Sequence, residues 1–273
     1  MPLAVLDFEM TGLDPERDRV CEVAVVRGAF DRVDAEFQSL VRPTVKVSKG
    51  ARKVHGLTDQ ILRRAPMFKR IAPELVKHLE GAVLVCHNVP FDVGFLHREL
   101  DDVGMPFAPP VSLDTLLMAR RLFAFKRNNL ENVARDLGVV FDQDHRALQD
   151  ARATLQVYRA MVDILAPDGG VTVRDLLDLM GALAPDSPRR LEQKRLLRKA
   201  FADKVTVFID YLSTGDPRLR PVHREIGLYA LSLPYMQGFC FLRQGERVFR
   251  LDRVHHVEPG GRPYEIPEFE RRV

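Results

Sequence analysis

The order of its apolar segments constrains the fold of this 273-residue chain more than any other feature. Residues 3–6 form a short apolar run typical of a buried strand, and strand-like segments follow at 21–30 and 35–43. The short connections between these three segments predict an antiparallel meander. A helical segment at 72–81, an apolar strand at 82–88 and further amphipathic helices then follow. This pattern predicts an α/β domain with a mixed sheet, which we expect to end near Leu165.

Acidic side chains follow two of these predicted strands. Asp7 and Glu9 come at the end of the first apolar run, and residues two apart in a strand face the same side, so we expect both carboxylates on one face and Phe8 in the core. A bare Asp-x-Glu pair is usually a pair of surface charges, but its place after a buried strand favours a site for a hard divalent cation, Mg²⁺ or Mn²⁺. Asp92 follows the apolar strand at 82–88, where a carboxylate could instead cap the next helix.

The spacing of His145 and Asp150 is also informative. Five positions on a helix correspond to roughly 500° of rotation, so within one helix the two side chains would lie about 140° apart. They share a site only if His145 lies in the preceding loop and Asp150 about one turn into the helix. Histidine has an unperturbed pKa of ~6.5, which suits a general base. With the carboxylates, His145 predicts a hydrolase that uses two metal ions to cleave phosphodiesters.

Six motifs resemble, in this order, those of the DnaQ-like, DEDDh-type 3′–5′ exonucleases, which have the ribonuclease H fold. They are DFEMTGL, VHGLTD, HNVPFDVGFL, SLDTLLMAR, NNLENVARDLGV and HRALQDA, and the resemblance covers about residues 2–165. It implies that Asp7, Glu9 and Asp150 ligate one metal ion, that Asp7 bridges to a second ion held by Asp92, and that His145 deprotonates the attacking water.

The same resemblance implies a pocket for the terminal nucleotide. Its residues would be Met10, Thr11, Gly12, Leu13, His55 and Asn88. Met10 stands where the family more often has threonine, and we expect this difference to affect nucleotide contacts more than chemistry.

A different pattern begins after residue 166. Pro188 opens a basic helix whose cations could follow the phosphates of a strand or could belong to a solvated linker, and short strands follow from Lys204. Residues 205–258, above all PYMQGFCFLRQGERVFRLDRV, resemble a WYL domain, a small Sm-like or SH3-like β-barrel, although its name-giving tryptophan is missing. The resemblance implies nucleic-acid binding, which we assign to Tyr235, Arg243, Arg250 and Arg253. Alternatively, these arginines are solvated faces of strands.

These patterns divide the chain into an exonuclease domain (1–166), a helical linker (167–203), a small all-β barrel (204–259) and a tail (260–273). Residues 186–273 carry 17 lysines and arginines against 12 acids, whereas the first 185 residues carry 24 against 26. A basic half joined to an acidic one suits a nucleic-acid substrate, because phosphates attract cations. The three cysteines have no metal-type spacing, which favours a reducing, cytoplasmic location. No apolar run approaches the ~18 residues of a membrane span.

The sequence therefore predicts an exonuclease, dependent on Mg²⁺ or Mn²⁺, that removes nucleoside monophosphates from single-stranded or frayed DNA 3′ ends in repair or processing. One alternative is the same chemistry on RNA. Another is a regulator that senses nucleic acid or a ligand and has an inert nuclease domain. No evident tethering segment supports association with a polymerase, and no membrane partner is expected.

Overall fold

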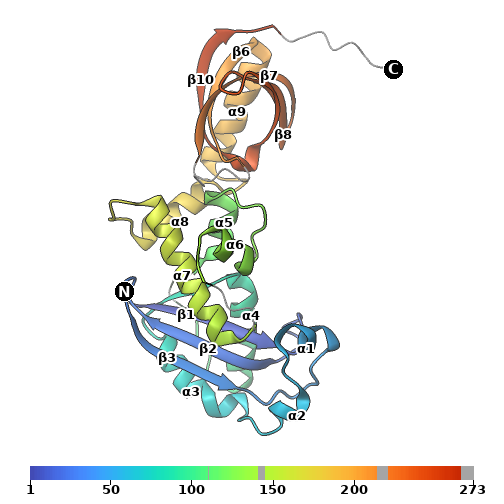
Figure 1. Ribbon diagram of the computed structural model, residues 1–273, viewed down its shortest axis with the longest axis vertical. Helices are drawn as coiled ribbons and strands as arrows, with labels where there is room; N and C mark the ends of the chain where they lie inside the picture. The colour runs from blue at the N-terminus through green and yellow to red at the C-terminus, as the bar shows by residue number, and fades with distance from the viewer. Residues whose placement is uncertain (110, 141–144, 214–220, 266–273) are drawn as a thin grey trace. The chain divides into compact units, whose positions relative to one another are not determined.

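The protein forms two compact units (Figure 1). The computed structural model describes residues 1–109, 111–140, 145–213 and 221–265. Unit 1 comprises residues 1–117 and 127–171, and unit 2 comprises residues 118–126 and 172–273. The chain therefore enters unit 2 twice, the first time for only nine residues.

Unit 1 contains a five-stranded mixed sheet in the order β3-β2-β1-β4-β5. The strands are β1 (Leu3–Met10), β2 (Val20–Gly28), β3 (Val33–Leu40), β4 (Val83–Cys86) and β5 (Ser112–Asp114). The first three form the predicted antiparallel meander, and β4 is parallel to both β1 and β5. The mixed sheet of a ribonuclease H-like fold is therefore confirmed.

The helices of unit 1 pack on both faces of this sheet. They are α1 (Lys49–His55), α2 (Asp59–Leu62), α3 (Phe68–Leu79), α4 (Val89–Asp102), α5 (Thr115–Leu122, which continues into unit 2), α6 (Leu130–Asp136) and α7 (Ala147–Leu165). Alternate β1 residues, Phe8 among them, pack with α3 and α4 in one core cluster. Helix α7 contacts β1 and β2. Since Asp7 and Glu9 alternate with Phe8, they face the side that α7 covers.

Helix α1 is an element that the sequence patterns did not predict. Ser48 caps its first turn by accepting a hydrogen bond from the Ala51 N–H, and Gly56 ends it with φ of 72°, a conformation that favours glycine. The next helix is capped in the same way, since the Thr58 side chain accepts from the Ile61 N–H at the start of α2.

Unit 2 contains a five-stranded antiparallel sheet in the order β10-β6-β7-β8-β9. Its elements are α8 (Val173–Ala182), α9 (Pro188–Asp203), β6 (Val205–Tyr211), β7 (Val222–Ser232), β8 (Tyr235–Cys240), β9 (Gly245–Arg250), a 3₁₀ turn (Leu251–Arg253) and β10 (Val254–Pro263). Leu197 and Ala200 of α9 pack into the core of this sheet. Pro188 opens α9 as predicted, whereas β10 continues to Pro263, into residues predicted to be a tail.

The burial of α9 does not follow residue type. Leu191 is 54% exposed, whereas the Arg190 side chain is buried. The guanidinium of Arg190 donates to the carbonyls of Leu251 and Val254, which explains how its charge is accommodated. Among the residues that the structure describes, no helix is both long and apolar enough to cross a membrane.

Candidate active site

The end of β1 and the first turns of α7 bring three carboxylates together. Oxygen atoms of Asp7, Glu9 and Asp150 lie within 4.8 Å of one another. Asp7 and Glu9 are side by side on β1, and Asp150 is the fourth residue of α7. One carboxylate oxygen of Asp150 is buried and has no hydrogen-bond partner among the described residues. A cluster of unpaired oxygen ligands of this kind suits a hard divalent cation.

The electrostatics of the cluster agree with this geometry. Burial raises the pKa of Glu9 to about 8, and the charges of Asp150 and Glu22 add to the effect. Burial also raises the pKa of Asp150 to about 6, against the opposing effect of His145. The pKa of Asp7 is raised well above its ordinary value by burial first and then by Asp92 and Asp150. Bound cations would favour the charged carboxylates and so offset both the burial and the mutual repulsion that raise these pKa values.

Asp92 is the fourth residue of α4 and is buried. Asn88 occupies the N-cap position of this helix, so Asp92 is not its cap. Burial raises the pKa of Asp92 to about 8, although hydrogen bonds from the backbone of Asp92 itself and of Phe8 oppose the rise. Asp92 lines the same pocket as Asp7, Glu9 and Asp150.

His145 precedes α7, as the helical phase predicted. Arg146 is the N-cap residue of α7, and His145 has φ of 43°, in the left-handed region that a histidine seldom adopts. This backbone conformation lets His145 and Asp150 face the same pocket although five positions separate them.

An ion pair between a buried carboxylate and a partly exposed arginine fixes the start of α7 against the sheet. The Glu22 side chain is fully buried on β2, opposite Glu9. Its carboxylate accepts from Arg146 at 2.6 and 3.0 Å, from Gln38 at 2.9 Å and from the Ala147 N–H at 3.2 Å. Although burial alone would raise the pKa of Glu22, hydrogen bonds from Arg146 and Gln38 lower it overall. Glu22 thus caps α7 from a neighbouring strand. Its only sequence signal is a lone acid in an apolar segment.

A pocket of about 270 Å³ surrounds these groups. The structure brings together ten of the eleven residues assigned to the site from the sequence, all except Thr11: Asp7, Glu9, Met10, Gly12, Leu13, His55, Asn88, Asp92, His145 and Asp150. Ala51, Val54, His87 and Phe91, which sequence reasoning missed, complete much of the lining.

Hydrogen bonds and close packing hold the loop after β1, which forms part of the pocket wall. His55 accepts from the Leu57 N–H through Nδ1, so its Nε2 donates to the Met10 carbonyl at 3.1 Å. Burial lowers the pKa of His55, which keeps the ring neutral. Thr11 is buried and bonded to Asp18, and a Cβ on Gly12 would lie 2.3 Å from the Asp18 carboxylate. A methyl group at this turn would therefore displace the Asp18 carboxylate.

In unit 2, the four assigned residues do not form one cluster. Tyr235 and Arg250 are cross-strand partners, and the Arg250 guanidinium carbon lies 5.8 Å from the centre of the exposed Tyr235 ring. Arg243 lies at the β8–β9 turn, at the other end of this hairpin, and Arg253 lies in the 3₁₀ turn.

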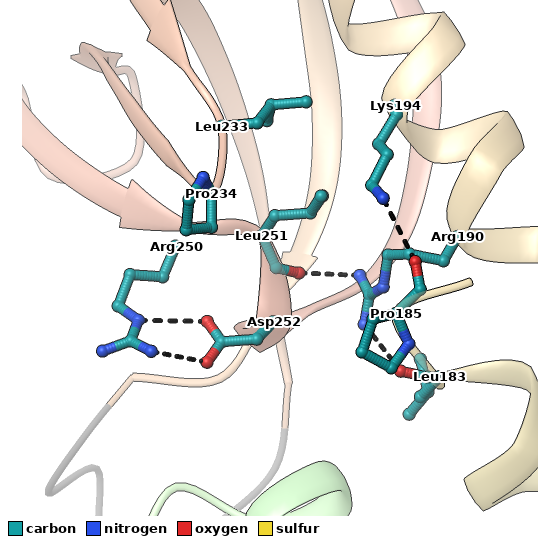
Figure 2. A pocket seen from close by; sticks show the side chains of 9 residues that line it. All are labelled: Leu183, Pro185, Arg190, Lys194, Leu233, Pro234, Arg250, Leu251 and Asp252. Carbon is teal, nitrogen blue, oxygen red and sulfur yellow. Dashed lines mark hydrogen bonds and ion pairs between the residues drawn. The ribbon is translucent and has the colours of Figure 1, made fainter. Parts of the chain in front are cut away.

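A pocket of about 410 Å³ lies next to Arg250 in unit 2. Figure 2 shows that its cations already have partners: Arg250 pairs with Asp252, Lys194 donates to the Pro185 carbonyl, and Arg190 donates to the Leu251 carbonyl. Its lining is otherwise apolar, with Leu183, Leu233 and Pro234 among the residues.

The fold and the carboxylates of unit 1 define a ribonuclease H-like α/β protein with a cluster of oxygen ligands suited to a divalent metal ion. Residues 4–158 match the RNase_T family model, described as an exonuclease, so more than half of the chain is covered. The protein belongs to this exonuclease family, whose members depend on divalent metals.

Two relatives illustrate the match. The chain is 32% identical over 176 residues to a DNA polymerase III PolC-type protein of Thermotoga petrophila, which covers 64% of this chain and 13% of that protein. It is 30% identical over 198 residues to the DNA polymerase III subunit epsilon of Treponema pallidum, which covers 68% of this chain and 91% of that subunit. The chain thus spans only a small part of the PolC-type protein.

The fold resembles that of E. coli Exonuclease I in complex with a dA16 oligonucleotide. The TM-score is 0.56 at 14% identity, and the match covers 88% of this chain and 54% of that chain. Unit 1 alone makes up less than 88% of the chain, so the match extends into part of unit 2.

Proposed function

We propose that this protein is a metal-dependent 3′–5′ exonuclease of the DEDDh type, which releases nucleoside monophosphates from single-stranded or frayed DNA 3′ ends. One observation carries the proposal: the carboxylates of Asp7, Glu9 and Asp150 converge within 4.8 Å in a pocket that also contains His145. A carboxylate cluster beside a histidine supplies both the metal ligands and the base that phosphodiester hydrolysis requires.

In this proposal, Asp7, Glu9 and Asp150 would hold one divalent cation, and Asp7 with Asp92 would hold a second. Two such ions, Mg²⁺ or Mn²⁺, would supply charge stabilisation to the attacking and leaving oxygens. His145 takes the proton from the attacking water. Its place before α7 keeps it at the pocket while Arg146 and Ala147, its neighbours, are fixed by Glu22.

The terminal nucleotide would lie against Met10, Gly12, Leu13 and Asn88. Leu13 is 81% exposed and offers an apolar surface for a base. Thr11 and His55 contribute indirectly in this proposal, because their polar atoms hold the loop after β1 and the Met10 carbonyl.

DNA is the proposed substrate because the relatives are named as parts of DNA polymerase III and a protein of similar fold is named in complex with a DNA oligonucleotide. The alternative is an exoribonuclease. Parallel digestion of DNA and RNA oligonucleotides of matched sequence decides between them, since discrimination rests on contacts with the 2′-hydroxyl.

For the C-terminal part, we propose a WYL-like domain with an Sm-like or SH3-like barrel over residues 204–259, preceded by a helical linker (167–203). The antiparallel five-stranded sheet supports this assignment. Tyr235 and Arg250 are the proposed nucleic-acid contacts, since a base can stack on the exposed ring. Arg243 and Arg253 would add contacts with phosphates. We further propose a cytoplasmic location, which the three free cysteines support. The proposed role is in DNA repair or processing.

The test is digestion of a 3′-hydroxyl oligonucleotide by purified protein with Mn²⁺ or Mg²⁺. We expect release of mononucleotides, and complete loss in the Asp7→Ala, Glu9→Ala and Asp150→Ala variants. Glu36→Ala, which removes a partly exposed acid from β3, serves as the control and keeps the rate. Full activity in any of the three site variants contradicts the metal assignment. Nucleic-acid binding without any nuclease activity favours a regulator instead.

A further inference from the structure

We propose that residues 42–70, which we call the basic segment, bind the sugar–phosphate backbone of the strand whose 3′ end enters the acidic pocket. The segment carries nine lysines and arginines against one acid, Asp59. The inference rests on the proposed function, because it takes the acidic pocket as the place of the 3′ end. It adds that the substrate is a polynucleotide held by several phosphates away from the reacting bond.

The charge of this segment is not neutralised by the protein. All nine cations are exposed, and within the described chain no ion pair or side-chain hydrogen bond joins any of them to another residue. Elsewhere in unit 1, several exposed cations pair with acids, as in Arg32–Asp34 and Arg135–Glu131. The one acid, Asp59, accepts a hydrogen bond from the Val47 N–H instead. Phosphates are therefore the fitting counterions for this surface.

The basic segment borders the acidic pocket directly. Ala51, Val54 and His55 of α1 line that pocket, and exposed cations lie on the same short helix, with Lys53 between two of the lining residues. The Ser48 N–H donates to the Thr11 carbonyl at 2.9 Å. This bond joins the start of α1 to the loop that follows β1. A strand whose end lies in the pocket thus meets the cations of α1 first.

Further cations of the basic segment line two neighbouring hollows. The first, of about 280 Å³, is lined by Arg42, Lys46 and Arg63. The second, of about 300 Å³, includes Lys69 and shares with the first the segment from Arg42 to Thr44. Figure 1 shows α1 and α2 together in unit 1, in line with the bond between Val47 and the Asp59 carboxylate at the start of α2. The two hollows are thus neighbours along the segment from Arg42 to Thr44, and cations of the basic segment line both of them.

Two acids in the second hollow do not cancel this charge. Glu99 accepts from the Val20 N–H, and burial raises its pKa, which favours the neutral form. Asp102 pairs with Arg19 and Arg98, both outside the basic segment.

Exposed apolar side chains alternate with the cations. Val45, Val54, Ile61 and Met67 are 36–55% exposed and all lie in the basic segment. Sugars and bases of a strand make apolar contacts with side chains of this kind. The mixture of unpaired cations and apolar side chains favours nucleic acid as the occupant over a purely ionic partner.

The test measures how the affinity for a labelled single strand depends on salt. Fluorescence anisotropy is recorded with the full chain in EDTA, so that no digestion occurs, between about 50 and 200 mM salt. The variant is Arg42→Gln/Lys46→Gln/Arg63→Gln. Each lost phosphate contact on a single strand lowers the slope of log K against log salt by about 0.7, so we expect a decrease of about 2 and roughly 100-fold weaker binding near 0.1 M salt.

The control removes three exposed cations elsewhere in unit 1: Arg32→Gln/Lys77→Gln/Arg135→Gln. These cations pair with nearby acids, and their loss changes the net charge by the same amount. We expect a slope close to that of the wild type. Circular dichroism and thermal unfolding verify that both variants are folded. Equal slopes and affinities in the two triple variants overturn the proposal, because net charge alone would then explain the binding.

The measurement separates this inference from the proposed function. If the wild type digests 3′ ends but both variants bind alike, the basic segment is not the strand surface and the nuclease assignment stands. If the slope changes as expected but no 3′ end is digested, the surface stands and the proposed function fails. Matched DNA and RNA strands are both measured. If neither strand binds through the segment, its occupant is another polyanion, such as an acidic protein, and the proposal is overturned.

Discussion

The buried Glu22 carboxylate is expected to matter for stability far more than its single charge suggests. The change Glu22→Gln keeps the shape of the side chain but replaces one acceptor oxygen with a donor. In one amide orientation, the new NH₂ group faces the Arg146 Nε–H and the Ala147 N–H. In the other orientation, it faces the Arg146 Nη2–H and the Gln38 side-chain amide. Two charge-assisted hydrogen bonds are therefore lost.

The magnitude follows from these contacts. A hydrogen bond to a charged group contributes about 1.5–3 kcal/mol, which gives roughly 3–6 kcal/mol for two. Two effects reduce this loss: the Arg146 side chain is 39% exposed, so water replaces part of its hydrogen bonding, and the repulsion between Glu22 and the carboxylates of Glu9 and Asp150 is relieved. We expect the free energy of unfolding of unit 1 to decrease by about 2–4 kcal/mol.

Urea unfolding of the full chain in EDTA, followed by circular dichroism, measures this loss. The matched control is Glu36→Gln, which weakens the bidentate Arg152–Glu36 pair between β3 and the same helix. This pair is partly exposed, so the control should cost about 1 kcal/mol or less. Since the folded-state pKa of Glu22 lies below its unfolded value, the stabilisation exists above that unfolded value and is lost as the pH falls through the folded pKa. Equal losses in the two variants would refute the reasoning.

Two further perturbations probe the acidic pocket. The pKa values of Glu9 and Asp92, both about 8, lie above those of the unfolded chain, so the metal-free protein loses stability as the pH rises from about 4 to 8. Mn²⁺ should therefore raise the melting temperature more at high than at low pH in thermal unfolding, and an equal rise would contradict the pKa assignment. Gly12→Ala should cost about 1–3 kcal/mol in urea unfolding, because the new methyl displaces Asp18; an unchanged midpoint would show that the loop adapts freely.

The sequence predicts the catalytic geometry well where a strict period governs it. Strand alternation places Asp7 and Glu9 on one face and Phe8 in the core, and the structure has this arrangement. Helical phase places His145 in the loop before α7, and the structure has it there with a left-handed backbone. Both inferences depend only on backbone geometry, which side-chain packing seldom overrides.

Features that depend on distant contacts were not predicted. In the sequence, Glu22 is an isolated acid in an apolar strand, and nothing nearby predicts its partner. That partner, Arg146, lies more than a hundred residues away in the sequence. Helix α1 has only seven residues and is stabilised by its Ser48 cap and its place beside the pocket, so it gives little periodic signal. The basic segment was hidden because its charge was averaged over the acidic first 185 residues.

The two passages of the chain through unit 2 have a consequence for synthesis. Residues 118–126 belong to unit 2, and Leu122, Phe123 and Phe125 are buried. The Arg121 guanidinium donates to the Met180 carbonyl, and the Arg121 backbone carbonyl accepts from the His255 ring. Both partners lie in residues that are synthesised later. On the ribosome, this apolar stretch emerges well before residues 172–273 and waits without its partners while the segments of unit 1 that flank it are completed. A shortened protein ending near residue 171 would lack the partners of this stretch in residues 172–273. It would therefore expose an apolar segment that favours aggregation, although the sequence of unit 1 would be complete.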